Sequence, residues 1–187
     1  MPVTLLGPDD YTTMPWANGK GSTVEYACER RSGGQVLWRF SQASVVEDGA
    51  FSLFPGIDRT IMLVSGPGFH LDFGGAGSAD VIEPFQPVRF SGDWVTRASG
   101  VSAACEDMNV MTARGFAHSA VRIHRSDAEL VLSDRTLLFV HEGKWQFEAG
   151  GAEHALAVSQ SALICGETGT VSIRGSGLLV EIAIDLI

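Results

Sequence analysis

A turn, a charged pair and an apolar run follow one another in Phe51-Ser-Leu-Phe-Pro-Gly-Ile-Asp-Arg-Thr-Ile-Met-Leu-Val-Ser-Gly66. Pro55-Gly56 predicts a tight turn, because proline fixes φ at the first corner and glycine tolerates a positive φ at the second. The run at residues 60–64 is too short for a typical helix and ends at another turn signature, Ser-Gly-Pro-Gly. The segment therefore predicts a turn that leads into a buried β-strand.

Arg59 stands at the start of this predicted strand, directly after Asp58. An arginine in this position can form an ion pair with the neighbouring carboxylate and so cap the structure. It can also direct its planar fork of donors at the carboxylate of a ligand. Both interpretations are open from the sequence, and Arg59 is the first candidate binding residue.

Short strands between turns continue through the rest of the chain. The 187 residues include 22 glycines, and apolar residues almost nowhere repeat at helical spacing. Turn signals that recur about every eight to twelve residues are typical of all-β proteins. The sequence therefore predicts an all-β fold, and its 45% of hydrophobic residues suffice for a core.

Residues 35–44 are predicted to form a strand in which Arg39, Ser41 and Ala43 share one face. This polar face lies either in solvent or along a cavity walled by neighbouring strands. The sequence does not choose between the two.

A second polar face is predicted within residues 106–111, where alternation places Asp107, Asn109 and Met111 on the same side of a strand. An Asp-x-Asn pair can satisfy buried backbone groups at a strand end. It can also orient an arginine and a ligand at the floor of a pocket.

Phe69-His-Leu-Asp-Phe73 alternates apolar and polar residues, and it is predicted to form a hairpin with the strand at 60–64 through Gly66-Pro67-Gly68. His70 and Asp72 then share a face. One histidine and one carboxylate fall short of a three- or four-ligand metal set, and the other histidines form no local cluster. We therefore predict no metal and no other cofactor.

An internal echo relates Asp134-Arg-Thr-Leu-Leu-Phe-Val to Asp58-Arg-Thr-Ile-Met-Leu-Val and indicates two similar β units. Arg135 occupies in the second unit the place of Arg59 in the first. No Phe-Pro-Gly turn precedes Arg135, so we expect it to form an ion pair and the single pocket to lie in the N-terminal unit. Ser126-Asp-Ala-Glu129 resembles a capping box and predicts one short helix between the units.

Composition excludes several classes of protein. A net charge of −9, with scattered acidic residues, argues against binding to nucleic acid or to an anionic membrane. Three cysteines without Cys-x-x-Cys spacing argue against a disulfide framework and a zinc site. The N-terminus lacks a basic region and a long apolar core, and no run approaches the length of a membrane span, so a cytoplasmic location is expected by default.

Four blocks taken together resemble the HutD/Ves family: Met14-Pro-Trp-Ala-Asn-Gly, Trp38-Arg-Phe-Ser, Phe51-Ser-Leu-Phe-Pro-Gly-Ile-Asp-Arg59 and Asp107-Met-Asn-Val-Met111. The resemblance implies a bicupin, two RmlC-like cupin β-barrel units in one chain, that lacks the usual cupin metal histidines. We expect an N-terminal cupin unit with the ligand pocket at residues 1–115 and a C-terminal cupin unit at 116–187, interleaved at the termini.

The resemblance also implies a function. The proposed role of the family is to modulate histidine utilisation by sensing an intermediate such as formylglutamate or urocanate, and its Ves branch is described only as stress-induced. We therefore expect a non-enzymatic protein that binds a small anionic metabolite, with no catalytic residue. The residues expected in the pocket are Arg59, Trp16, Asn18, Arg39, Ser41, Phe54, Asp107, Asn109 and Met111.

Two alternatives stay open at this point. One is a metal-free cupin isomerase or hydrolase in which His70 or a pocket carboxylate transfers protons. The other is a structural dimer partner without a ligand, since the edges of barrels often pair.

Overall fold

The computed structural model describes residues 3–16, 21–166 and 169–187. Its regular elements are β-strands and two short 3-10 helices, η1 (Pro8–Asp10) and η2 (Gly74–Ala76), which confirms the predicted all-β class. The chain divides into two compact units. Thr12–Phe116 forms the N-terminal unit, and Met1–Tyr11 joins Ala117–Ile187 in the C-terminal unit.

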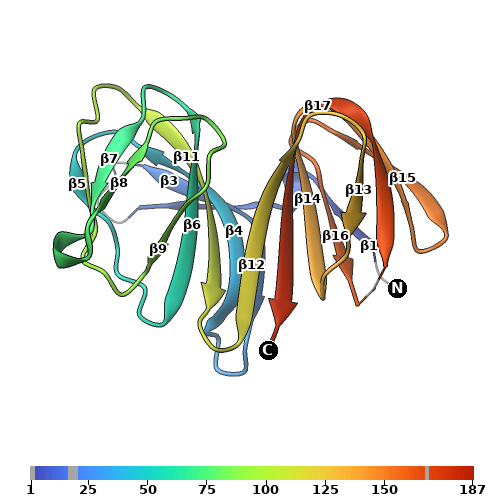
Figure 1. The fold of residues 1–187 in the computed structure, drawn as a ribbon, viewed down its shortest axis with the longest axis horizontal. Helices are drawn as coiled ribbons and strands as arrows, with labels where there is room; N and C mark the ends of the chain where they lie inside the picture. Colours follow the sequence, from blue (N-terminus) through green and yellow to red (C-terminus); the bar gives the residue numbers. More distant parts are fainter. Residues whose placement is uncertain (1–2, 17–20, 167–168) are drawn as a thin grey trace. The chain divides into compact units, whose positions relative to one another are not determined.

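The N-terminal unit consists of two antiparallel sheets (Figure 1). The six-stranded sheet has the order β2 (Thr12–Pro15), β3 (Ser22–Arg30), β4 (Val36–Val45), β11 (Cys105–Ala113), β6 (Ile57–Ser65) and β9 (Val88–Ser91). The four-stranded sheet has the order β5 (Gly49–Ala50), β10 (Arg97–Ser99), β7 (Phe69–Asp72) and β8 (Ser78–Val81). Apolar side chains from both sheets, among them Ile61, Leu63 and Leu71, form one buried cluster. The core of this unit therefore lies where the two sheets face each other.

The predicted hairpin between β6 and β7 is wrong. β6 pairs with β11 and β9, whereas β7 pairs with β10 and β8, so the chain passes from one sheet to the other at this point. Gly66 and Gly68 have φ values of +97° and +86°, and a Cβ on either would lie 2.5 Å from a backbone oxygen. The glycines make a corner in which two backbones approach closely, which the sequence pattern alone does not distinguish from a hairpin turn.

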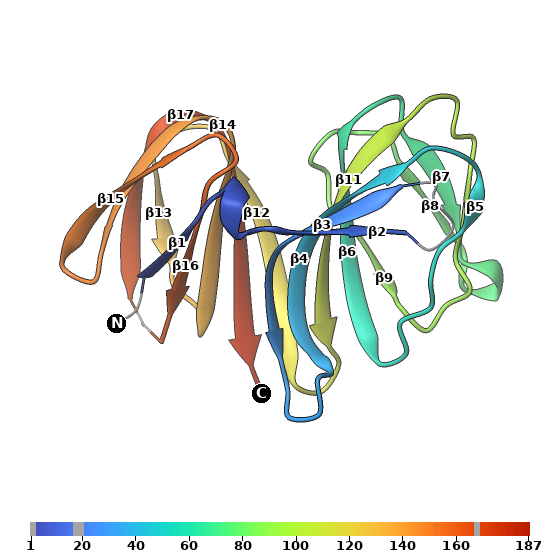
Figure 2. The ribbon, with the colours of Figure 1, turned by 180° about the vertical axis from the view of Figure 1, so that it is seen from behind.

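The C-terminal unit is one curved seven-stranded sheet (Figure 2). Its strands are β1 (Val3–Leu6), β16 (Ser161–Cys165), β14 (Arg135–Ala149), β17 (Thr170–Leu186), β12 (Ala117–His124), β13 (Ala128–Val131) and β15 (Ala152–Ala157). β1 pairs antiparallel with β16, from Val3 opposite Ile164 to Leu6 opposite Ser161. This pairing is why the first residues of the chain belong to the C-terminal unit.

The short helix predicted at residues 126–129 is also wrong. β13 begins at Ala128 and pairs with β17, and Asp127 accepts a hydrogen bond from the Gly175 backbone N–H at 2.8 Å. The acidic side chain satisfies a backbone donor of a neighbouring strand here, which is a common alternative to capping a helix.

The two segments of the internal echo each lead into a change of strand partner. β6 and β7 pair with different strands, and so do the two halves of β14. β14 pairs with β16 at residues 135–139 and with β15 at residues 144–149, with a register shift between Val140 and Glu142 on the side of β17. Gly143 lies at this corner with a φ of +83°. Arg135 is half-buried at the start of β14, and its Nη1 donates to the Asp134 carbonyl oxygen at 3.0 Å.

Gly143→Ala is expected to destabilise the protein far more than Gly151→Ala. Both glycines have a positive φ, which costs an alanine roughly 1–2 kcal/mol. A Cβ at Gly143 would also overlap the Ser176 carbonyl oxygen, whereas a Cβ at Gly151 meets no described atom within 4 Å. Overpacking should add about 1–3 kcal/mol to the loss at Gly143, measured by urea denaturation. Equal losses of stability in the two variants would show that the two backbones that meet at Gly143 can move apart.

Candidate functional site

Three neighbouring strands of the six-stranded sheet bring polar side chains to one face. Arg39 on β4 and Arg59 on β6 both lie opposite Met111 on the central strand β11. Ser41 lies opposite Asn109 in the same way. Because alternate residues of paired strands point to the same side, these groups form rows across one face of the sheet.

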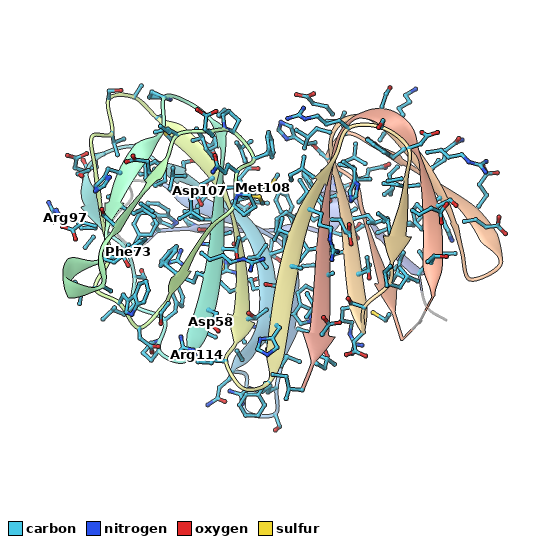
Figure 3. All side chains as sticks on the ribbon, in the orientation of Figure 1. Asp58, Phe73, Arg97, Asp107, Met108 and Arg114 are labelled. Carbon is cyan, nitrogen blue, oxygen red and sulfur yellow. The ribbon has the colours of Figure 1, made fainter. Side chains whose placement is uncertain are left out.

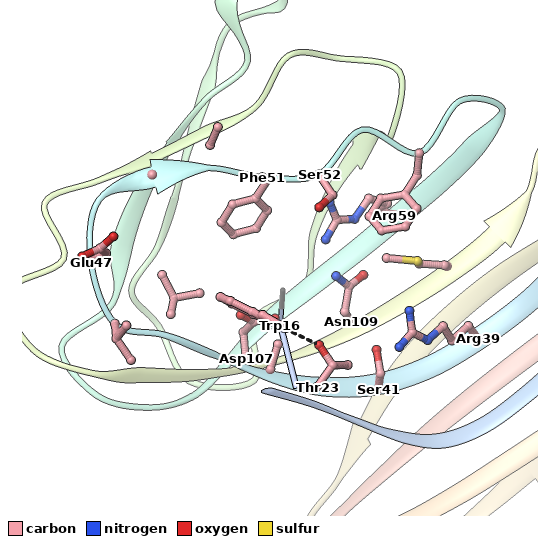
Figure 4. Close-up of a pocket in the computed structure, with 17 residues that line it drawn as sticks. Trp16, Thr23, Arg39, Ser41, Glu47, Phe51, Ser52, Arg59, Asp107 and Asn109 are labelled. Atoms are coloured by element: carbon pink, nitrogen blue, oxygen red, sulfur yellow. Dashed lines mark hydrogen bonds between the residues drawn. The ribbon is translucent and has the colours of Figure 1, made fainter. Parts of the chain in front are cut away.

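This face lines a cavity of about 460 Å³ in the N-terminal unit (Figure 4). The predicted site residues that the structure brings together around it are Trp16, Arg39, Ser41, Phe54, Arg59, Asp107, Asn109 and Met111. Asn18, the remaining predicted residue, lies outside the described residues. The ligand-binding role of all these residues stays a prediction.

Several lining residues were not foreseen. They are Thr23, Ala43, Val45, Val46, Glu47, Gly49, Ala50, Phe51 and Ser52. Strand alternation places Ala43 on the face of Arg39 and Ser41, so the sequence held a signal for it. The segment at residues 46–52 carries no periodic pattern, and its place beside the cavity follows only from the fold.

Arg59 is the most buried basic residue in the lining of the cavity, with 5% of its surface exposed. Its Cζ lies 4.8 Å from the ring centroid of Phe90, 5.2 Å from that of Phe54 and 5.5 Å from that of Phe51. Its Nε has no hydrogen-bond partner among the described residues. Burial lowers the pKa of Arg59 to about 10, against an opposing effect of Asp107, so the guanidinium is charged at neutral pH.

The expected alternative, an ion pair between Arg59 and Asp58, is wrong. Adjacent residues of a strand point to opposite faces of the sheet, so Asp58 turns away from the cavity. It forms an ion pair with Arg114 instead, at 2.6 Å.

Arg39 differs from Arg59 in having a counterion. Its Nε lies 2.8 Å from Glu25 Oε2, and both side chains are largely buried. The angle between the two groups is not that of a hydrogen bond, so the contact is an ion pair only. The positive charge of Arg39 is therefore matched within the fold.

Asp107 and Asn109 lie beside the two arginines on β11. Asp107 is 2% exposed, and burial raises its pKa to about 7, an effect that Arg59 opposes and Glu106 reinforces. Asn109 is 5% exposed, and its Oδ1 has no hydrogen-bond partner within the described ranges. Figure 4 shows Arg39, Asn109 and Arg59 near one end of the cavity and Glu47 at the other. The cavity thus has a basic end and an acidic group that titrates near neutral pH.

Trp16 lines the cavity. It is fixed by hydrogen bonds to β3 and to Gly21, the residue that precedes β3. Its Nε1 donates to Thr23 Oγ1 at 2.9 Å, and its backbone N–H donates to the Gly21 carbonyl oxygen at 2.9 Å. A Cβ at Gly21 would lie 3.1 Å from the indole ring, so the absence of a side chain there gives Trp16 its place.

His70, the proposed proton-transfer group of the enzyme alternative, is not among the residues that line this cavity. It lies on β7 with its side chain 43% exposed, and its Nδ1 is 2.7 Å from Asp80 Oδ1. Among the described residues, no three histidine, cysteine, aspartate or glutamate side chains form a group that could hold a metal ion. In the same residues, no helix is long and apolar enough to cross a membrane.

Comparison with known proteins identifies the family. A model of HutD matches residues 8–180 of the chain. The chain belongs to the HutD family. This HutD-family chain is 34% identical to Protein Ves of Citrobacter koseri over 141 residues, which cover 73% of each protein. The predicted family is therefore confirmed.

The fold of the HutD-family chain also has solved counterparts. HutD from Pseudomonas fluorescens SBW25, in a formate condition, superposes with a TM-score of 0.85 at 24% identity, covering 100% of both chains. A cupin 2 conserved barrel domain protein from Leptotrichia buccalis superposes with a TM-score of 0.58 at 7% identity, covering 94% of this chain and 96% of that one. The fold is thus cupin-like.

Proposed function

We propose that the cavity of the N-terminal unit binds a small carboxylate metabolite and that the protein senses or buffers this metabolite without transforming it. The observation that carries the proposal is Arg59, a buried guanidinium whose Nε lacks a partner in the described part of the chain. Removing a charge from water is unfavourable unless an opposite charge or hydrogen bonds compensate for it. A bound anion would provide that compensation.

The chemistry of the cavity fits a carboxylate. The planar fork of an arginine matches the two oxygens of a carboxylate, and three phenylalanine rings pack around the fork of Arg59. Ser41 and Asn109 supply neutral hydrogen-bonding groups on the same face. A volume of about 460 Å³ lies in the usual range of small-molecule sites.

Family membership directs the choice of metabolite. We propose formylglutamate and urocanate as the first candidates and the modulation of histidine utilisation as the role. A bicupin organisation of the two units and a cytoplasmic location belong to the same proposal.

Isothermal titration calorimetry tests the binding proposal. Formate, formylglutamate and urocanate are each titrated into the protein, with formamide as the uncharged counterpart of formate. We expect one site per chain for each carboxylate, competition among the three, and affinity for formamide at least roughly tenfold weaker, because it lacks the charge that Arg59 pairs with. Arg97→Ala, which changes an exposed arginine of the same unit, should leave the affinities unchanged. No binding of any carboxylate at millimolar concentration would refute the proposal.

One observation favours a second candidate, the metal-free cupin enzyme. Asp107 faces the cavity, and burial raises its pKa to about 7, which suits a group that transfers protons at neutral pH. Incubation of the protein with urocanate or formylglutamate, followed by proton NMR, separates the two candidates. Conversion that disappears in Asp107→Asn would favour the enzyme, and unchanged substrate favours the binding protein.

A further inference from the structure

The turn that carries Phe54 packs closely against Gly92 and forms backbone hydrogen bonds with it. Within the turn, the Ile57 N–H donates to the Phe54 carbonyl oxygen at 3.1 Å, and Gly56 has a φ of +73°. The Phe54 N–H donates to the Gly92 oxygen at 2.8 Å, and the Gly92 N–H donates to the Ile57 oxygen at 2.7 Å. A Cβ at Gly92 would lie 2.5 Å from the Phe54 oxygen, so this contact leaves no room for a side chain.

Two surface residues, Asp93 through its side chain and Arg114 through its backbone, hold the same turn from outside the cavity. Asp93 Oδ1 accepts a hydrogen bond from the Gly56 N–H at 2.8 Å, and the Arg114 backbone N–H donates to the Gly56 oxygen at 2.8 Å. The Arg114 side chain holds Asp93 in turn, through Nη1 and Oδ2 at 2.5 Å. The peptide groups on both sides of Gly56 are therefore fixed.

Arg114 also binds Asp58, near the start of β6. Its Nε and Nη2 donate to Asp58 Oδ1 at 2.9 and 2.6 Å, and Figure 3 shows the two side chains next to each other on the N-terminal unit. Asp58 is the residue before Arg59 and points to the opposite face of the strand. One guanidinium thus connects the turn that carries Phe54 with the strand that carries Arg59.

We propose that Arg114, Asp93 and Asp58, together called the Arg114 clamp, position the Phe54 ring against the Arg59 guanidinium and thereby set the geometry of the anion site. The inference rests on the proposed function for its consequence in binding. The three side chains are about half exposed, and ion pairs of this kind contribute little to global stability. Their effect on a nearby binding geometry can be larger, because recognition through a planar fork depends strongly on orientation.

The clamp is tested with Asp93→Ala and Asp93→Asn, using Asp80→Ala as the control. Asp80 belongs to another exposed ion pair of the same unit, the one with His70. The first readout is the NMR resonance of the Arg59 Nε–H in the ligand-free protein, which senses the ring current of Phe54. The second is the affinity for formate, and the third is the midpoint of urea denaturation.

Asp93→Ala should shift the Arg59 resonance and weaken formate binding roughly tenfold, with little change in the denaturation midpoint. Asp93→Asn keeps an acceptor for the Gly56 N–H and should restore the Arg59 resonance and the formate affinity in part. Asp80→Ala should change neither the Arg59 resonance nor the formate affinity.

An unmoved Arg59 resonance in Asp93→Ala would overturn the inference, whether or not formate affinity falls. A shifted resonance in a protein whose wild type does not bind formate would uphold the positioning role and refute the proposed function. The two ideas can therefore fail separately.

Discussion

Arg59→Met is expected to weaken carboxylate binding strongly and, at the same time, to stabilise the ligand-free protein. Truncating one partner of a buried charge pair costs about 2–5 kcal/mol of binding free energy, so the affinity should fall at least roughly thirtyfold. Methionine fills a similar volume among Phe51, Phe54 and Phe90 and makes favourable contacts with aromatic rings. Replacing a buried charge by an apolar group of similar volume should stabilise the fold by up to about 4 kcal/mol.

Formate titrations and urea denaturation of the same samples measure the two effects of this substitution. Arg59→Lys keeps the charge but loses the planar fork, so its affinity should lie between those of wild type and Arg59→Met, without the gain in stability. Arg97→Met, at an exposed position of the same unit, is the control and should change neither quantity substantially. An unchanged formate affinity in Arg59→Met would place the ligand elsewhere. A less stable Arg59→Met would mean that the fold already compensates the charge.

Asp107 is expected to make the protein less stable as the pH rises from about 4 to about 7. Burial raises the pKa of its carboxyl from 3.8 to about 7, so the folded state retains a proton that the unfolded state releases. In that window the unfolded state binds fewer protons, and the free energy of unfolding falls by about 1.4 kcal/mol per pH unit. The contribution is complete below pH 3.8 and lost above about pH 7, a total on the order of 4 kcal/mol.

Asp107→Asn isolates this contribution, because asparagine has the shape of the protonated acid without its titration. Urea denaturation of wild type and variant between about pH 4 and 9 should give curves that diverge as the pH rises to about 7, with the variant the more stable. Asp185→Asn, at an exposed carboxylate, should run parallel to wild type. Parallel curves for Asp107→Asn would contradict the prediction.

The same ionisation should affect ligand binding. An ionised Asp107 places a negative charge in the cavity, so wild-type affinity for formate should fall as the pH passes about 7. Asp107→Asn should show no such fall. A fall of equal size in the variant would assign the pH dependence to another group.

Strand faces were the part of the fold that sequence predicted best. The period of two is a local property of an extended chain, so Arg39 and Ser41 on β4, and Asp107 and Asn109 on β11, could be assigned to common faces before their pairing was known. The pairing of β4 with β11 then brought the two faces together. The hairpin at Gly66 was wrong because a glycine corner between two sheets and a glycine turn within one sheet have the same local sequence signature.

The electrostatic state of the site could not be predicted in the same way. Whether Arg59 is solvated or buried depends on the rings of Phe51 and Phe90, which reach it from other elements. Burial is also the main cause of the raised pKa of Asp107, and burial is a property of the whole unit. The exclusion of an ion pair between Arg59 and Asp58, by contrast, follows from strand alternation and was available from the sequence.

The pairing of β1 with β16 has a consequence for synthesis of the protein. β1 leaves the ribosome before the N-terminal unit, but its partner β16 (Ser161–Cys165) emerges only after the whole of that unit has been made. The N-terminal unit is a continuous stretch of chain and can fold while β1 is still without its neighbour. Until β1 pairs with β16, the outer edge of β16 is an open template for strands of other molecules. Removing β1 should therefore endanger the solubility of the C-terminal unit, although β1 lies more than a hundred positions before the other strands of that unit in the sequence.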